Sequence, residues 1–163
     1  MAEGVIKRYE LTRTWDVLYD VISRNMTDPL LTYKKEDVSA RTPATEWIRN
    51  GFPNPSTLGK AGAWRFPLVV IGISNIDDDT AVLDASKDFI THSIDIECHA
   101  TSRKITAQMA EEIRNILKTT AQNDLRKATL HGPDILGTTE DSDFIGSHKF
   151  YTKTMEYEFK RFD

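Results

Sequence analysis

The sequence predicts an α+β fold in which an antiparallel or mixed β-sheet is packed by an N-terminal helix and one long helix on one face. Two stretches, residues 12–25 and 104–127, repeat their apolar residues at helical spacing. Two others, residues 89–100 and 151–160, alternate apolar and polar residues as half-exposed strands do. A sheet with helices on one side buries the apolar side of all four stretches.

The first helix is expected from about Thr12 to Asn25, with Thr12 or Thr14 as its cap. Its apolar stripe comprises Leu11, Trp15, Leu18, Tyr19, Ile22 and Met26. The stripe ends at Asp28-Pro29, because proline disfavours a helical residue before it. The next segment, Leu30 to Lys35, is predicted as a short strand.

A long irregular loop at about residues 40–65 follows, with three of the six prolines and three of the eight glycines. It is too long to be a simple connection. Its aromatic side chains, together with the residue that follows it, are Trp47, Phe52, Trp64 and Phe66. These rings indicate that the stretch packs either on the chain's own sheet or on a neighbouring subunit. Because exposed apolar patches usually mark interaction sites, the four residues are predicted to contact a neighbouring subunit or another partner, with Phe52 and Trp64 as anchors.

Three strands are expected around this framework. The apolar run from Phe66 to Ile76 is typical of a central strand, and Asn75 to Thr80 carries a turn signal that opens a loop to about Lys87. From Phe89 to Ala100, one face carries Ile90, His92, Ile94, Ile96, Cys98 and Ala100. A final strand at the C-terminus carries Tyr151, Met155, Tyr157 and Phe159 on one face.

The strongest helical pattern runs from about Lys104 to Lys127, with Thr101 or Ser102 as its cap. A straight helix of this length would span roughly 36 Å, enough to cross a small sheet. Its basic residues alternate with Glu111, Glu112 and Asp124, so we expect a solvated face of mixed charge. The segment between this helix and the last strand is predicted as a loop.

Composition places the chain among ordinary globular proteins. Its 163 residues are 39% apolar and 28% charged, with a formal net charge of −4, and they are expected to form a single domain, residues 1–163. The longest apolar run is far shorter than the roughly 20 residues that cross a bilayer, and no signal-peptide pattern begins the chain, so no membrane role is expected. A single cysteine, Cys98, excludes an internal disulfide.

No motif for catalysis, cofactor binding or metal binding is present, so no catalytic, cofactor or metal residue is predicted. His92 and Cys98 share a strand face but lie roughly 20 Å apart, too far for one metal ion. His99 lies on the opposite face, and His131 and His148 fall in predicted loops; the roles of all four histidines stay open. The two acidic clusters are expected to be solvated turns: Asp77 to Asp79, and Glu140 with Asp141 and Asp143.

The order of these elements resembles that of the tail terminator family, also called tail completion or head-to-tail joining proteins, of long-tailed bacteriophages and archaeal tailed viruses. The resemblance lies in the N-terminal helix, Gly51-Phe52-Pro53 leading to Trp64-Arg65-Phe66-Pro67-Leu68, the alternating strand, the long helix and a terminal strand ending Tyr157-Glu158-Phe159. It spans most of the chain. The long loop and residues 132–147 match no motif of this family.

The resemblance implies a structural virion protein without enzymatic activity or cofactor. Proteins of this family form rings, commonly hexameric, that cap the tail tube and join it to the head connector. It therefore implies partners in copies of the chain, the tail tube protein and the head-tail connector protein, with DNA passing through without specific binding. The expected location is the tail-neck junction of a virion assembled in the host cytoplasm.

Three other interpretations stay open. Another neck or baseplate ring protein would share the virion role at a different position. A non-viral ferredoxin-like binding module would share the helices on a sheet but would be monomeric or dimeric. A small enzyme would need converging polar residues, for which His92, His131 and Glu97 are the first candidates.

Overall fold

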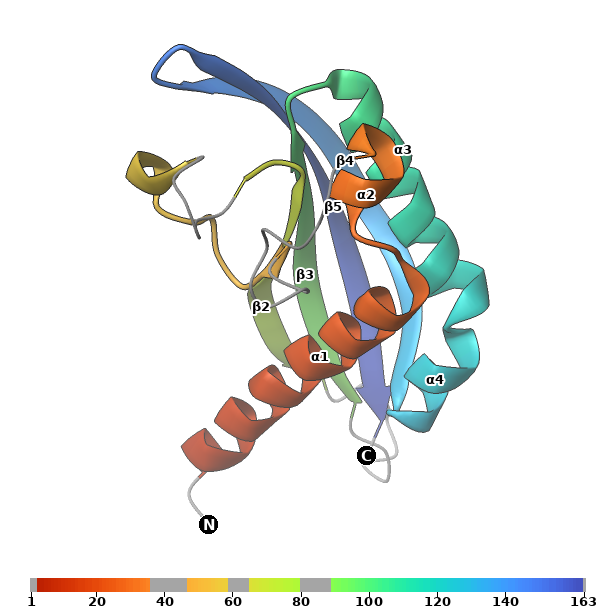
Figure 1. The fold of residues 1–163 in the computed structure, drawn as a ribbon. Helices are drawn as coiled ribbons and strands as arrows, with labels where there is room; N and C mark the ends of the chain where they lie inside the picture. The colour runs from red at the N-terminus through yellow and green to blue at the C-terminus, as the bar shows by residue number, and fades with distance from the viewer. Residues whose placement is uncertain (1–2, 36–46, 59–64, 80–88, 163) are drawn as a thin grey trace.

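The computed structural model describes residues 3–35, 47–58, 65–79 and 89–162. These residues form a mixed α+β arrangement, which confirms the predicted fold class (Figure 1). The elements before the first hairpin are α1 (Glu3–Asn25), α2 (Pro29–Lys34), β1 (Ile48–Arg49) and the 3-10 turn η2 (Pro55–Thr57). They are followed by β2 (Leu68–Asp79), β3 (Phe89–Ala100), α3 (Arg103–Asn115), the π-helical segment η3 (Ile116–Thr120), α4 (Gln122–Lys127), β4 (Leu130–Ile145) and β5 (His148–Phe162).

The sheet has the strand order β1-β2-β3-β5-β4. Its only parallel pair among the described strands is β1 with β2, whereas β2, β3, β5 and β4 pair antiparallel along the sheet. β4 forms one edge of the sheet, and β5 lies between β3 and β4. The β4–β5 hairpin is the longest strand pair and reaches past the rest of the sheet at its turn (Figure 1).

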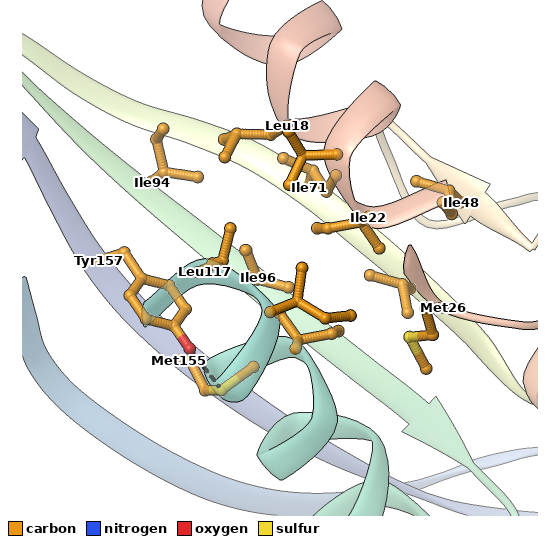
Figure 2. Packing of buried hydrophobic residues seen from close by; sticks show 14 of the residues in the cluster. Leu18, Ile22, Met26, Ile48, Ile71, Ile94, Ile96, Leu117, Met155 and Tyr157 are labelled. Carbon is orange, nitrogen blue, oxygen red and sulfur yellow. Dashed lines mark hydrogen bonds between the residues drawn. The ribbon is translucent and has the colours of Figure 1, made fainter. Parts of the chain in front are cut away.

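The main core lies between the sheet and the helices α1, α3 and α4, which share one face of the sheet (Figure 1). Alternation along each strand sends every second side chain to this face. Figure 2 shows Leu18 and Ile22 of α1 meeting Ile71 of β2, all of them fully buried. The other labelled members come from β1, β3, η3, β5 and the residue that follows α1: Ile48, Ile94, Ile96, Leu117, Met155, Tyr157 and Met26.

A second, smaller apolar cluster lies on the opposite face of the sheet. It consists of Phe66, Leu68, Val70 and Phe150, with the half-buried Leu58 and Ile145 packed against it. Leu68 and Val70 alternate with Val69 and Ile71 of the main core, so β2 is apolar on both faces. This two-sided burial explains the uninterrupted apolar run that predicts a central strand there.

Two predictions for the N-terminal region are wrong. The first helix begins at Glu3, so Thr12 and Thr14 lie inside it and do not cap it. Residues 30–35 form no strand, because Asp28 caps a short helix, α2: its side chain accepts a hydrogen bond from the backbone N–H of Leu30 at 2.9 Å. Pro29 takes the first helical position, where its missing N–H is not needed.

The long second helix is present but is not continuous. After Asn115 the chain widens into a π-helical segment, closed by a bond from the N–H of Ala121 to the carbonyl of Ile116 at 2.8 Å. α4 then continues to Lys127. The wider turn keeps the apolar stripe on the sheet, since Ile116, Leu117, Ala121 and Leu125 are all buried.

The predicted loop after this helix is a strand, β4, whose side chains mostly face solvent. Its polar sequence lacks the alternation of a half-buried strand, and its pairing with β5 uses backbone groups that any sequence supplies. The predicted turn is also wrong for its residues Asn75 to Asp79, because these residues belong to β2. The rest of that turn and its loop, residues 80–87, lie outside the described residues.

The predicted long loop at 40–65 contains β1 and η2 within its described part, residues 47–58. β1 adds to the sheet beside β2, with the N–H of Val69 donating to the carbonyl of Trp47. Residues 40–46 and 59–64, including Trp64, lie outside the described residues. No described helix is long and apolar enough to cross a membrane.

Candidate functional site

The sheet face opposite the helices, called the open face below, carries the polar side chains of β3 and β5. Strand alternation places Asp95, Glu97 and His99 on this face, because Ile94, Ile96 and Cys98 between them are buried in the main core. The register sets each against a residue of β5: Asp95 opposite Glu156, Glu97 opposite Thr154, and His99 opposite Thr152. This set of polar residues in mid-sheet is the candidate site.

A hydrogen-bonded chain of three side chains crosses the two strands. The Nε2 atom of His99 lies 3.1 Å from Oε2 of Glu97, and Nδ1 lies 2.8 Å from Oγ1 of Thr152. Nδ1 pairs with the hydroxyl of Thr152. Because a carboxylate only accepts, the N–H at Nε2 donates to Glu97. This hydrogen bond from His99 holds the pKa of Glu97 below its ordinary value, although burial acts in the opposite direction.

A hydroxyl, an imidazole and a carboxylate in series also occur in nucleophilic catalysis, where backbone N–H groups stabilise the oxyanion. Thr152 lies within β5, and β5 is paired on both sides, with His99 of β3 and Asp141 of β4 opposite this residue. The neighbouring backbone N–H groups are therefore engaged in the sheet ladder. The chain Glu97–His99–Thr152 fixes the position of the imidazole, and the strands supply no oxyanion site beside it.

Aromatic rings cover this network. The ring of Phe52 meets the imidazole of His99 edge to face at 4.9 Å between centroids and stacks on Phe150 at 5.6 Å. Phe150 in turn stacks on Phe66 at 5.1 Å. Phe66 and Phe150 are buried, whereas Phe52 is 38% exposed. Phe52 is thus the outer ring of a stack that joins the segment before β2 to the open face.

A hollow of about 670 Å³ lies beside this stack, between η2 and the β4–β5 hairpin. Its aromatic wall is formed by Phe52 and Phe150 and its floor by Glu97, His99 and Thr152. Asp141 and Asp143 line the hairpin side and are exposed. The hollow is therefore aromatic on one wall and acidic on the other.

Negative charge continues along the open face beyond the hollow. Asp95 lies opposite Glu156 and beside Glu97 on its own strand. Burial, followed by repulsion from Glu156 and Glu97, raises the pKa of Asp95. These carboxylates disfavour binding of phosphates and favour a partner with positive charge.

The four predicted interface residues separate into three groups. Trp47 is buried in the main core, only 2% exposed, and Phe66 is buried in the cluster on the open face. Among the three residues that the structure describes, Phe52 is the one with an exposed side chain. Trp64 lies outside the described residues. Their contact with a partner stays a prediction, and among the described three only Phe52 offers an exposed ring for it in this conformation.

The histidines do not come together. His92 is fully buried and contacts Thr14 of α1, His99 belongs to the open face, and His131 and His148 are exposed near opposite ends of the β4–β5 hairpin. Across residues 3–35, 47–58, 65–79 and 89–162 no group of three His, Cys, Asp or Glu side chains is arranged to hold a metal ion. Asp77 to Asp79 lie in β2 and Glu140 to Asp143 in β4, so both acidic clusters belong to strands and not to turns.

Sequence reasoning missed Thr152, Phe150, Asp141 and Asp143 as parts of one site. Asp141 and Asp143 lie two apart, which in a strand means one face, and Gly146-Ser147 after them is typical of a hairpin turn. This spacing and the Gly-Ser pair together indicate a hairpin, but the polar composition of the segment favours a loop. The partnership of His99 with Thr152, 53 positions apart, has no local signal at all.

No protein-family model and no curated protein matches the sequence. Among solved structures, the chain is similar to a chain of "Virion of native gene transfer agent (GTA) particle", with 9% identity and a TM-score of 0.47. The match covers 87% of this chain and 98% of the other.

Proposed function

We propose that this chain is a structural protein of a tailed virus particle, a tail terminator that assembles into a ring, caps the tail tube and joins it to the head connector. One structural observation carries the proposal together with the resemblance in element order. The sheet is covered by helices on one face and presents an aromatic and acidic hollow on the other. A subunit with two different faces is suited to repeated head-to-tail contacts.

The mechanism is geometric. In a closed ring each copy uses one surface patch to meet a different patch on the next copy, so two distinct faces are required. Two apolar clusters pack against the sheet, one on each side of β2. Close packing on both sides keeps the sheet rigid, so the two faces keep a fixed position relative to each other. The remaining two surfaces of the ring then meet the tail tube protein on one side and the connector on the other.

Phe52 is the proposed anchor of such a contact. Its ring is supported from below by Phe150 and His99, so little side-chain freedom remains to be lost on binding. The segment that contains Phe52 is fixed on both sides of the sheet: Trp47 is buried in the main core, and Phe66 is buried in the cluster on the open face. Trp64, the other predicted anchor, keeps the role that the sequence suggests.

DNA passes through the ring without specific binding in this proposal. The chain has 21 basic against 25 acidic residues, so it supplies no general positive field for phosphates. The proposed location is the tail-neck junction of the virion, reached by assembly in the host cytoplasm.

Native mass spectrometry and negative-stain imaging test the proposal. We expect a closed ring of about six copies, populated at high concentration or on tail tubes. Phe52→Ala should weaken assembly, whereas Leu136→Ala, which truncates another exposed apolar side chain on β4, serves as the control. A monomer or dimer at every concentration, with no binding to tubes, would refute the proposal and favour a ferredoxin-like binding module. A ring that binds elsewhere in the particle would identify another neck or baseplate protein.

A further inference from the structure

The two faces of the sheet carry opposite charges at the same end, where the β4–β5 hairpin turns. On the open face, Asp141 and Asp143 of β4 flank the hollow. Lys149 lies on the helix side, beside Tyr151. Its ammonium lies 5.8 Å from the centre of the ring of Phe144, its partner across the hairpin, which also borders the hollow. Alternation along the two paired strands therefore places Asp141 and Asp143 on one side and Lys149 on the other. Glu140 lies on the side of Lys149 and is paired there with Lys153 at 3.5 Å.

The helix side of this end is extended by residues from α2 and α3. Arg103 and Lys149 both lie over the ring of Tyr151, at 5.5 and 5.4 Å from its centre. The ammonium of Lys34 donates to Oγ1 of Thr101 at 3.0 Å, which brings the end of α2 beside the start of α3. The basic face is defined here as the exposed side chains Lys34, Lys35, Arg103, Lys104 and Lys149.

We propose that the basic face of one copy packs into the acidic hollow of the next copy, head to tail. The inference rests on the proposed ring and names the two surfaces that meet in it. Cations held over Tyr151 enter a hollow whose rim carries Asp141 and Asp143 and whose floor carries Glu97. The half-exposed ring of Phe52 offers them a π face at the same place.

The chemistry favours a second copy as the occupant, because the chain itself carries both complementary surfaces. They lie on opposite sides of the sheet: α2 and α3 on one side, and the segment that contains η2 on the other (Figure 1). A copy therefore cannot satisfy its own hollow, but a neighbour can. Like faces cannot pair, because basic would meet basic or acidic would meet acidic, so the contact is heterologous and forms rings or filaments.

Charge reversal on each face tests the proposal. The first variant, Asp141→Lys with Asp143→Lys, makes both faces basic; the second, Arg103→Glu with Lys149→Glu, makes both faces acidic. All four side chains are exposed, so melting temperature and circular dichroism should stay near those of the wild type. The matched control, Asp16→Lys with Lys127→Glu, reverses two exposed charges on α1 and α4.

Sedimentation velocity measures the assembly of each protein at about 0.1 M salt. Charges farther apart than about 10 Å are screened at this ionic strength, so the measurement reports on close charge pairs between copies. Each variant alone should need at least tenfold more protein than the wild type to assemble, while the control assembles normally. An equimolar mixture of the two variants should assemble again, with the variants alternating, which native mass spectrometry resolves by mass.

The outcomes separate this inference from the proposed function. A wild-type ring that both variants also form, each at the wild-type concentration, overturns the inference and leaves the ring proposal standing. A wild type that never assembles, in solution or on tubes, overturns both. Loss of assembly in each variant without recovery in the mixture means that the two faces do not meet each other, and also overturns the inference.

Discussion

The hydroxyl of Thr14 lies 3.2 Å from Nδ1 of the His92 ring and joins α1 to β3 across 78 positions of sequence. Both side chains are buried, at 1% and 0% exposure. Beside this contact, the indole N–H of Trp15 donates to the carbonyl of Ile71 in β2 at 3.1 Å, so polar contacts join α1 to two strands within a largely apolar packing. The Thr14–His92 contact also explains why a histidine occupies an apolar strand face.

Thr14→Val keeps the volume of the side chain but removes the hydroxyl. We expect a loss of about 1–3 kcal/mol in the free energy of unfolding, because the buried imidazole loses this partner. Chemical denaturation measures the loss. Ser23→Ala, which removes an exposed hydroxyl from the same helix, should change stability by less than about 0.5 kcal/mol. Equal stability of the two variants would contradict the contact.

Asp95 is predicted to destabilise the folded protein at neutral pH. Its folded-state pKa is raised, so stability falls as pH rises from the unfolded-state value through the folded-state value. Asp95→Asn should therefore raise the melting temperature at pH 7. The gain should vanish below roughly pH 4, where the carboxyl is protonated in both states. A gain independent of pH would point to a cause other than charge.

Glu97, two residues along the same strand, should behave in the opposite way. Its folded-state pKa is lowered by the hydrogen bond from His99, so it contributes stability above its unfolded-state pKa of about 4.3. That contribution is lost as pH falls through the folded-state pKa. Glu97→Gln should lower the melting temperature at pH 7 and converge with the wild type in acid. Parallel melting curves over the whole pH range would count against the Glu97–His99 pair.

Gly132 holds a backbone conformation that other residues rarely adopt, with φ at +117°. A Cβ atom there would also lie 3.0 Å from the carbonyl oxygen of Glu158 and 3.2 Å from the backbone nitrogen of Asp134. Gly132→Ala should cost about 1–3 kcal/mol of stability, measured by thermal unfolding. Gly51→Ala, where a Cβ meets nothing within 4 Å, is the control and should be nearly neutral.

Cys98 should be chemically silent in the folded protein. Burial raises the pKa of its thiol to about 12, and the side chain is fully covered by the main core. A thiol reagent at pH 8 should therefore react with the native wild type only as fast as the protein unfolds, because the thiolate is the reactive form. Full reaction is expected in denaturant. Ser142→Cys, on the exposed hairpin, should react at once and serves as the positive control.

Sequence alone predicted those features that a local repeat of apolar residues encodes. The alternation from Phe89 to Ala100 identified β3 with its correct bounds and placed His92 and Cys98 on the core face. The helical stripe likewise placed Ile113 and Leu117 against the sheet. These assignments succeeded because a side chain's direction depends only on its position within its own element.

Helices and strands that no local repeat of apolar residues encodes were predicted wrongly. β4 is polar and exposed, and it exists because its backbone pairs with β5. Its sequence therefore carries no amphipathic pattern that could predict it. The strand predicted at Leu30 to Lys35 is a helix because a cap at Asp28 outweighs the short apolar run.

The sequence by itself determined the fold class, the helical stripe and the faces of β3. Only the tertiary structure decided which aromatic residues of the long segment are buried, with Trp47 in the core and Phe52 outside. It also decided that His99 meets Glu97 and Thr152, and that Asp141 and Asp143 flank the hollow while Lys149 lies beside Arg103 over Tyr151. The physical reason is that register and packing join residues far apart in sequence, whereas periodicity reports only on neighbours along the chain.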